Sequence, residues 1–200
     1  PLLPWSLGCQ FASINQQMCD AFVLVNDGRF RANGSCGYVL KPDSMISKND
    51  VVSSATRLST HQSLPKNWRF QILSGYNLPK HRKKAAGKKI NPKVRVTLYD
   101  GGTSAPIVHL TERVEKNGFN PVWDETKGAS FDDVKNPDCA VVLFSLWDDD
   151  DSKKEYFLAA AAIPLSCMRH GYRSVPLFDS NHRRCGAHAF SSLFIKVSAS

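Results

Sequence analysis

An apolar segment runs directly into four consecutive aspartates between Cys139 and Asp151, where the sequence reads C-A-V-V-L-F-S-L-W-D-D-D-D. A short apolar run of this composition is typical of a buried strand. Four neighbouring carboxylates repel one another and each needs solvent or a cation, so the row is not expected to continue the strand. The stretch therefore predicts a core strand that ends at the rim of a domain and an acidic loop after it. That loop is either a solvated turn or a source of oxygen ligands for a hard cation such as calcium.

Strand-like segments recur at regular spacing through the last two thirds of the chain. The clearest is Lys93–Tyr99, in which apolar and polar residues alternate. In Trp68–Ser74 the same alternation places Phe70, Ile72 and Ser74 on one face. Eight short strands separated by turn residues predict a mainly β fold, an eight-stranded antiparallel β-sandwich. The predicted strands are Trp68–Ser74, Lys93–Tyr99, Pro106–Thr111, Gly128–Phe131, Cys139–Trp147, Phe157–Ile163, Tyr172–Phe178 and Ser191–Val197.

The first block of the chain, residues 1–42, has strand-like runs at Cys9–Ile14 and Gly37–Leu40. Two strands do not form a stable unit alone, so we expect this block to be the end of a larger domain. Residues 43–66 are rich in Ser and Thr without periodicity, which favours a linker to the sandwich at 67–200. Because the chain lacks an initiating Met, we expect it to be cut from a longer protein.

The formal net charge of +8 and the pI near 9.3 favour an anionic partner, either membrane phospholipid or nucleic acid, or reflect solubility alone. No apolar run approaches the length of a membrane span. A nucleic-acid partner is not expected, because the lysines are not interleaved with the stacking aromatics that single-strand binding proteins use and no groove-binding motif is present.

The six cysteines are expected to be reduced, buried thiols of a cytosolic protein. None stands in a Cys-x-x-Cys pair, and several lie in apolar, strand-like runs. That spacing favours free thiols over disulfides or a zinc site.

Three motifs resemble known families. The run C-G-Y-V-L-K-P from Cys36 to Pro42 resembles the end of the Y half of eukaryotic phosphoinositide-specific phospholipase C. That resemblance implies that residues 1–42 are the last strands of a TIM-barrel catalytic domain. The runs L-S-G-Y-N-L-P at Leu73–Pro79 and N-G-F-N-P-V-W-D at Asn117–Asp124 resemble a C2 domain. Residues near the C-terminus resemble the final strands of the C2 domain in delta-type phospholipases C.

The resemblance implies an activity for the full enzyme, a phosphoric diester hydrolase that cleaves phosphatidylinositol 4,5-bisphosphate to diacylglycerol and inositol trisphosphate. It also implies catalytic calcium, and catalytic residues that lie outside this chain. None of the six histidines matches a catalytic motif, and the fragment alone is not expected to be active. The implied partners are phosphoinositides and the upstream catalytic barrel, and the implied location is cytoplasmic, peripheral at the inner face of the plasma membrane. The alternative is a non-catalytic, phospholipase-C-like module that binds phospholipid membranes.

The C2 resemblance also implies a metal site at the acidic loop. Asp148 and Asp150 match the D-x-D pair of calcium-binding C2 domains, and Asp151 follows them. Asn91 stands where those domains carry another aspartate, and it offers an oxygen without a charge. Because calcium affinity rises with the number of charged ligands, we expect weak calcium binding, or none without lipid.

A basic stretch precedes the second strand of the sandwich, and residues 51–99 contain no Asp or Glu. Its candidate membrane-binding residues are Lys80, Arg82, Lys83, Lys84, Lys88 and Lys89. Each such cation contributes roughly 1 kcal/mol to binding at an anionic bilayer. The alternative is that the stretch is a solvated loop with no binding role. We expect this loop and the aspartates to share one edge of the sandwich, where lysines could neutralise the carboxylates in place of calcium.

Overall fold

A computed structural model describes residues 1–42, 64–81, 88–100, 105–123, 126–149 and 154–200. Two helices precede eight strands, and two 3₁₀ turns, η3 and η4, lie near the C-terminus. The elements are α1 (Leu2–Ser6), α2 (Ala21–Arg31), β1 (Trp68–Tyr76), β2 (Pro92–Tyr99), β3 (Ile107–Leu110), β4 (Ala129–Phe131), β5 (Val141–Asp149), β6 (Glu155–Pro164), η3 (Leu165–Cys167), β7 (Gly171–Pro176), η4 (Gly186–His188) and β8 (Ser192–Ala199).

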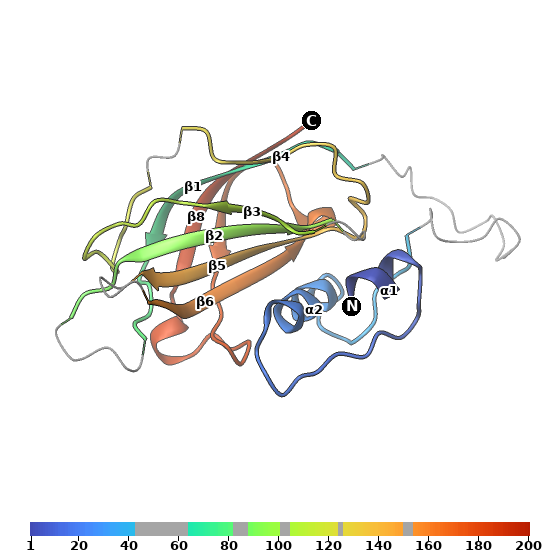
Figure 1. The fold of residues 1–200 in the computed structure, drawn as a ribbon, viewed down its shortest axis with the longest axis horizontal. Coiled ribbons are helices and arrows are strands. Elements are labelled where there is room, and N and C mark those ends of the chain that lie inside the picture. Colours follow the sequence, from blue (N-terminus) through green and yellow to red (C-terminus); the bar gives the residue numbers. More distant parts are fainter. Residues whose placement is uncertain (43–63, 82–87, 101–104, 124–125, 150–153) are drawn as a thin grey trace, which may run out of the picture.

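The strands form two four-stranded sheets that pack face to face (Figure 1). One sheet has the order β4-β1-β8-β7, the other has the order β3-β2-β5-β6, and every strand pair in both is antiparallel. All eight predicted strands are confirmed, and their ends differ from the predicted ones by no more than two residues. The predicted antiparallel sandwich is therefore the fold that β1–β8 form.

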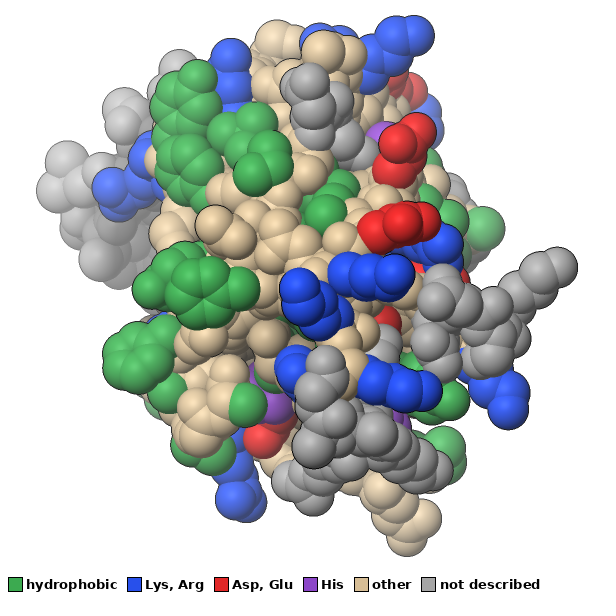
Figure 2. Space-filling view, turned by 90° about the vertical axis from the view of Figure 1, so that its left-hand side faces the viewer, with side chains coloured by type: hydrophobic (Ala, Val, Ile, Leu, Met, Phe, Trp, Pro, Cys, Tyr) green, Lys and Arg blue, Asp and Glu red, His purple; other side chains and the backbone are tan. Residues whose placement is uncertain are grey.

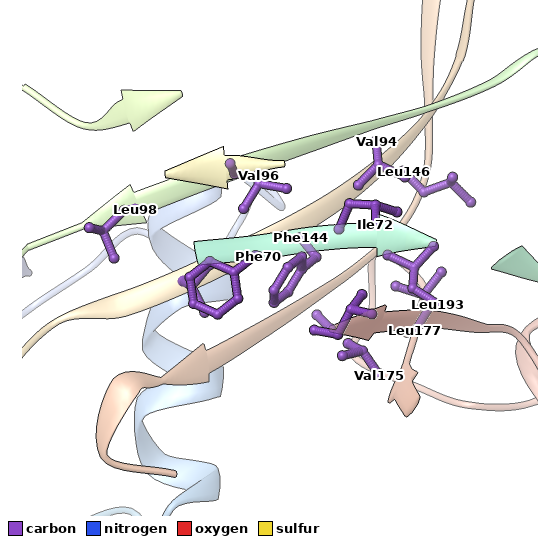
Figure 3. Close-up of a cluster of buried hydrophobic side chains, with 14 of the residues drawn as sticks. Phe70, Ile72, Val94, Val96, Leu98, Phe144, Leu146, Val175, Leu177 and Leu193 are labelled. Atoms are coloured by element: carbon purple, nitrogen blue, oxygen red, sulfur yellow. The ribbon is translucent and has the colours of Figure 1, made fainter. Parts of the chain in front are cut away.

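The core lies between the two sheets and is built from the inward-facing residue of each alternating pair (Figure 3). On β2 these residues are Val94, Val96 and Leu98, all buried as their alternation predicts. The ring of Phe70 from the first sheet meets the ring of Phe144 from the second edge to face, with the centroids 5.7 Å apart. Because Phe70 and Phe144 are both buried, this contact links the two sheets at the centre of the core.

Strand β1 contains an irregularity that changes which side chains point inward. Its pairing with β8 shifts between Ile72 and Ser74, which is a β-bulge. Before the bulge Phe70 and Ile72 are buried, whereas after it Gly75 is buried and Tyr76 is exposed. The expectation that Ser74 shares the inward face of Phe70 and Ile72 is therefore wrong, because the extra residue inverts the alternation.

The first block is helical where strands were expected. The runs Cys9–Ile14 and Gly37–Leu40 form no strand, and α2 lies between them. Helix α2 begins after Asp20, whose carboxylate accepts hydrogen bonds from the backbone N–H groups of Phe22 and Val23, both at 2.9 Å. A strand needs a neighbour for its backbone groups, and none of the described strands pairs with these two runs. The predicted linker 43–66 lies outside the described residues up to residue 63.

Helix α2 packs against the outer face of the second sheet, on strands β5 and β6 (Figure 1). Gly28 makes this contact close, because a side-chain carbon there would lie 2.5 Å from both Cβ and the carbonyl oxygen of Ala162. The Arg29 guanidinium is buried and donates to the backbone carbonyl of Asp138 at 2.9 Å. A second hydrophobic cluster, separate from the central core, therefore joins the two blocks. Its buried members are Leu24, Val25, Tyr99, Val141, Leu143 and Ala160.

All six cysteines are free, as expected, but only Cys139 is buried. The expectation of burial is wrong for the other five, which lie in surface loops and 3₁₀ turns, whereas Cys139 lies just before β5 and is covered by Arg29 of α2. These exposed cysteines are Cys9, Cys19, Cys36, Cys167 and Cys185. Among the described residues, no helix has the length and hydrophobicity needed to span a bilayer.

Candidate functional site

The acidic and basic segments of the sequence meet at the end of the sandwich where β2 begins and β5 ends. Pro92 pairs with Asp148 across β2 and β5, and Asp148 pairs with Tyr156 across β5 and β6. Strand β1 ends at this same edge, so the segment that joins β1 to β2 starts and finishes there. We call this end of the molecule the loop edge, and Figure 2 shows it face on.

The first two aspartates of the acidic row belong to β5, which continues to Asp149. The expectation that the row would end the strand is therefore wrong at these two positions. Asp148 is 0% exposed, and its Oδ1 accepts a hydrogen bond of 2.9 Å from the backbone N–H of Asn91. A buried carboxylate is costly unless it is hydrogen-bonded, and this bond holds Asp148 to the residue before β2. Asp148 therefore has a structural partner at the base of the loop edge.

Asn91 is also engaged on both sides of its amide. Its Oδ1 accepts from the backbone N–H of Lys116 at 2.9 Å, and its Nδ2 donates to the backbone carbonyl of Asp149 at 3.1 Å. Asn91 thus ties together three segments of the loop edge: the end of β5, the start of β2 and the segment after β3. An aspartate at this position could accept from Lys116 but could not donate to Asp149.

Basic side chains from β2 form ion pairs with two further carboxylates of the loop edge, those of Asp149 and Glu155. Lys93 Nζ lies 3.0 Å from Oε1 of Glu155 and 3.8 Å from Oδ2 of Asp149. Arg95 Nη2 lies 3.0 Å from Oε2 of Glu155. The hydrogen bond from Lys93, followed by the charges of Lys93 and Arg95, lowers the pKa of the Glu155 carboxyl below its ordinary value. A lysine therefore neutralises part of the acidic edge, and in the described structure that lysine comes from a strand and not from the basic loop.

The two described residues of the predicted metal site, Asn91 and Asp148, already have protein partners. Asn91 and Asp148 use side-chain oxygens for protein hydrogen bonds, and Lys93 stands between Asp149 and Glu155. Across the described ranges, no three His, Cys, Asp or Glu side chains group closely enough to hold a metal ion. The other two predicted ligands, Asp150 and Asp151, lie outside the described residues.

The basic segment is described at its two ends. Lys80 at one end and Lys88 and Lys89 at the other are exposed, and no ion pair or hydrogen bond joins their side chains to the described residues. The ring centroid of His81 lies 4.8 Å from that of Tyr156, with the two rings tilted by 33°, so the start of the basic segment touches the start of β6.

The described flanks of the basic and acidic loops therefore share one edge of the sandwich. Three predicted cations, Arg82, Lys83 and Lys84, lie outside the described residues. Figure 2 shows Lys and Arg side chains near the middle of this face and hydrophobic side chains along one side of it.

Two of these features were missed in the sequence. Alternation along β2 places Lys93 and Arg95 on the outer face, but it does not identify Glu155 as their partner. The exposure of Tyr76 at the end of β1 was also missed, because the bulge that exposes this residue has no marker in the sequence.

The sandwich with its loop edge is a C2 domain. Residues 66–179, more than half of the chain, match the C2 domain family, and residues 1–44 match the family described as phosphatidylinositol-specific phospholipase C, Y domain. A C2 domain of plant Extended Synaptotagmin 1 has the same fold, with a TM-score of 0.52 and 18% sequence identity over 68% of this chain and 95% of that one.

Relatives that carry both segments are similar over nearly the whole chain. Human 1-phosphatidylinositol 4,5-bisphosphate phosphodiesterase delta-1 is 34% identical over 99% of this chain and 25% of its own length. Human inactive phospholipase C-like protein 2 is 36% identical over 96% of this chain and 16% of its own length. The crystal structure of S. officinalis PLC21 superimposes on all of this chain and 24% of that one, with a TM-score of 0.77 and 30% identity.

The chain belongs to the phosphoinositide-specific phospholipase C family, in which it joins the end of a Y domain to a C2 domain. It spans about a quarter or less of the length of these relatives.

Proposed function

We propose that this chain is the C-terminal portion of a phosphoinositide-specific phospholipase C that hydrolyses phosphatidylinositol 4,5-bisphosphate to diacylglycerol and inositol trisphosphate. The order of its two segments and its similarity to delta-type enzymes support this proposal. The chemistry is assigned to residues upstream of this chain. The C2 domain is assigned a docking role at the anionic, inner face of the plasma membrane.

The exposed lysines of the loop edge carry the docking proposal. Lys80, Lys88 and Lys89 extend into solvent with no described partner for their charges, whereas Lys93 is held by Glu155 and Asp149. A free ammonium group can approach a lipid phosphate without first breaking an ion pair. Arg82, Lys83 and Lys84 would add to the same positive field, which falls off within a Debye length of the bilayer surface.

Replacing Lys88 and Lys89 together with alanine is expected to weaken binding to phosphatidylcholine vesicles that contain phosphatidylserine by roughly thirtyfold. Each lysine contributes roughly 1 kcal/mol at an anionic surface. The loss of two lysines therefore removes about 2 kcal/mol of binding free energy, which corresponds to roughly thirtyfold in affinity. Sedimentation of the chain with vesicles, repeated at rising ionic strength, measures the effect. Binding of the unaltered chain should survive calcium chelation and decline with salt.

The matched control replaces two exposed lysines at the opposite end of the sandwich, Lys66 and Lys135, with alanine. This variant carries the same net charge as the first one but leaves the loop edge intact. Equal losses in both variants would mean that only the overall charge matters, and the docking proposal would then be rejected.

Calcium is expected to bind this edge weakly, with a dissociation constant on the order of 10⁻⁴–10⁻³ M or higher in the absence of lipid. The reason is that Asn91 and Asp148 already serve as hydrogen-bond partners and Lys93 neutralises neighbouring carboxylates. Calorimetric titration of the chain with calcium, with and without phosphatidylserine vesicles, tests this expectation. A micromolar dissociation constant without lipid would contradict it and would favour a site formed with Asp150 and Asp151.

A second candidate function is a non-catalytic module of a phospholipase-C-like protein. The 36% identity with human inactive phospholipase C-like protein 2 favours it as much as the delta-type relatives favour an enzyme. Assay of the full-length protein for hydrolysis of phosphatidylinositol 4,5-bisphosphate in vesicles separates the two. Turnover supports the enzyme, and vesicle binding without turnover supports the module.

A further inference from the structure

Two aromatic side chains stand exposed against each other beside the basic segment. Tyr76, the last residue of β1, is 55% exposed, and Phe119, in the segment between β3 and β4, is 62% exposed. Their ring centroids lie 5.9 Å apart. Large apolar side chains that are exposed together, and not singly, mark interaction sites on soluble proteins. The two rings are separate from the central core, so packing of the sandwich does not account for them.

The backbone around this pair is held firmly. The N–H of Asn77 donates to the carbonyl of Phe119 at 2.6 Å, and the N–H of Leu78 donates to the carbonyl of Gly118 at 2.9 Å. On the other side, the N–H of Gly75 donates to the carbonyl of Pro121 at 2.9 Å. The aromatic pair is therefore fixed on a hydrogen-bonded platform, and docking of its rings would cost little ordering of the backbone.

The backbone that carries the aromatic pair is also close to both ends of the basic segment. On the outgoing side, Asn77 and Leu78 lead within two residues to the exposed Lys80. On the returning side, a side-chain carbon at Gly118 would lie 2.5 Å from Cγ1 of Ile90, so the buried Ile90 packs directly under this turn. Ile90 follows Lys89 in the chain. Aromatic rings and unpaired lysines thus occupy adjoining parts of the loop edge.

We infer that Tyr76 and Phe119 form a membrane anchor whose rings enter the interfacial layer of an anionic bilayer while the neighbouring lysines contact lipid phosphates. This inference rests on the proposed docking function. It attributes the apolar part of membrane binding to the two rings, because the lysines supply only electrostatic attraction. Aromatic rings partition into the headgroup region of bilayers, and their binding adds to the electrostatic attraction. The tyrosine hydroxyl can remain hydrated while its ring is buried.

The charge around the two rings and their position at the loop edge favour a lipid bilayer as the partner of this surface. The cations next to the rings complement a surface that is both anionic and apolar at shallow depth. The outer face of β5 and β6 is already covered by α2 from the Y-domain segment, whereas the loop edge remains open in the described structure. A protein partner is the competing occupant, and it is an outcome of the test below.

Replacement of Phe119 by tryptophan provides a direct readout of insertion. The new indole is expected to shift its emission to shorter wavelength and to be quenched by brominated phosphatidylcholine when phosphatidylserine-containing vesicles are added. The four native tryptophans give the background, measured on the unaltered chain. The matched control is Ile107→Trp, because Ile107 is 48% exposed but pairs with Leu98, about 20 Å along β2 from the loop edge. Its emission should not respond to the quencher.

Removal of the ring tests the energetic contribution. Phe119→Ser is expected to weaken vesicle binding by about tenfold, and the lost component should be insensitive to salt because it is apolar. Ile107→Ser should leave the affinity unchanged. Absence of quenching at position 119 together with unchanged affinity for Phe119→Ser would overturn the inference and leave the rings to a protein partner.

Failure of the underlying docking proposal has a different signature. In that case the unaltered chain would bind phosphatidylserine-containing vesicles no better than vesicles of phosphatidylcholine alone, and the variant without Lys88 and Lys89 would behave like the unaltered chain. Retained, lysine-dependent binding without any contribution from Phe119 would reject the anchor alone.

Discussion

Replacement of Trp123 by alanine is expected to lower the free energy of unfolding of the sandwich by about 3–5 kcal/mol, the usual cost of deleting a large buried ring. Trp123 is buried in the central core, and its indole Nε1–H donates to the backbone carbonyl of Glu112 at 2.9 Å. The variant would therefore leave a cavity between the sheets and a carbonyl without its hydrogen bond. Urea denaturation followed by circular dichroism measures the change.

The neighbouring residue supplies the control. Val122 is 67% exposed, so Val122→Ala removes side-chain atoms from the same segment without opening the core, and a change within about 0.5 kcal/mol is expected. A loss below about 1 kcal/mol for Trp123→Ala would mean that the core closes around the missing ring. That result would contradict the role of this tryptophan as a main support of the C2 sandwich.

Replacement of Gly28 by valine is expected to release helix α2 from the sandwich at a cost of about 3 kcal/mol, at the upper end of the range for overpacking. The first carbon of the new side chain would fall 2.5 Å from both Cβ and the carbonyl oxygen of Ala162. Ala162 of β6 pairs with Leu143 of β5, so its backbone cannot move away without disturbing the pairing of these two strands. Helix and sheet would have to separate.

Hydrogen exchange of the α2 amides measures this release. An 11-residue helix is only marginally stable alone, so its amides should lose protection while those of β5 keep it. The matched control is Asn26→Val, which introduces the same β-branched residue into the same helix at a position whose side chain makes no hydrogen bond to the described residues. Equal loss of protection in both variants would attribute the effect to helix propensity and not to the close contact at Gly28.

The sandwich could be predicted from the sequence because each strand carries its own signal. In β2 the alternation of apolar and polar residues over Lys93–Tyr99 is local, and its outcome does not depend on the partner strand. The same local signal failed at Ser74, because the β-bulge is a property of the pairing between β1 and β8 and leaves no mark in the composition of either strand.

The first block could not be predicted in the same way. Cys9–Ile14 and Gly37–Leu40 have strand-like composition, but a strand forms only where another edge accepts its backbone hydrogen bonds. The signal that was available and not used is Asp20, a helix N-cap residue placed directly before Ala21–Arg31.

At the loop edge, the sequence identifies which residue types gather but not how they are paired. The acidic row and the lysines were expected to share one edge of the sandwich, and the ring contact between His81 and Tyr156 joins the described ends of the two segments there. The sequence did not indicate that Asp148 would be buried against Asn91 or that Lys93 would bridge Asp149 and Glu155. Those partners come from different strands, and only the register of the sheet brings them together.

The β-bulge in β1 decides which side chains the end of this strand presents to solvent. If β1 kept its length but paired with β8 without the bulge, strict two-residue alternation would turn Tyr76 toward the interior and Gly75 toward solvent. A C2 domain of this family could therefore acquire or lose an outward aromatic ring through a change in strand pairing, with the aromatic residue itself unchanged. Comparison of relatives by residue identity alone would not detect such a change.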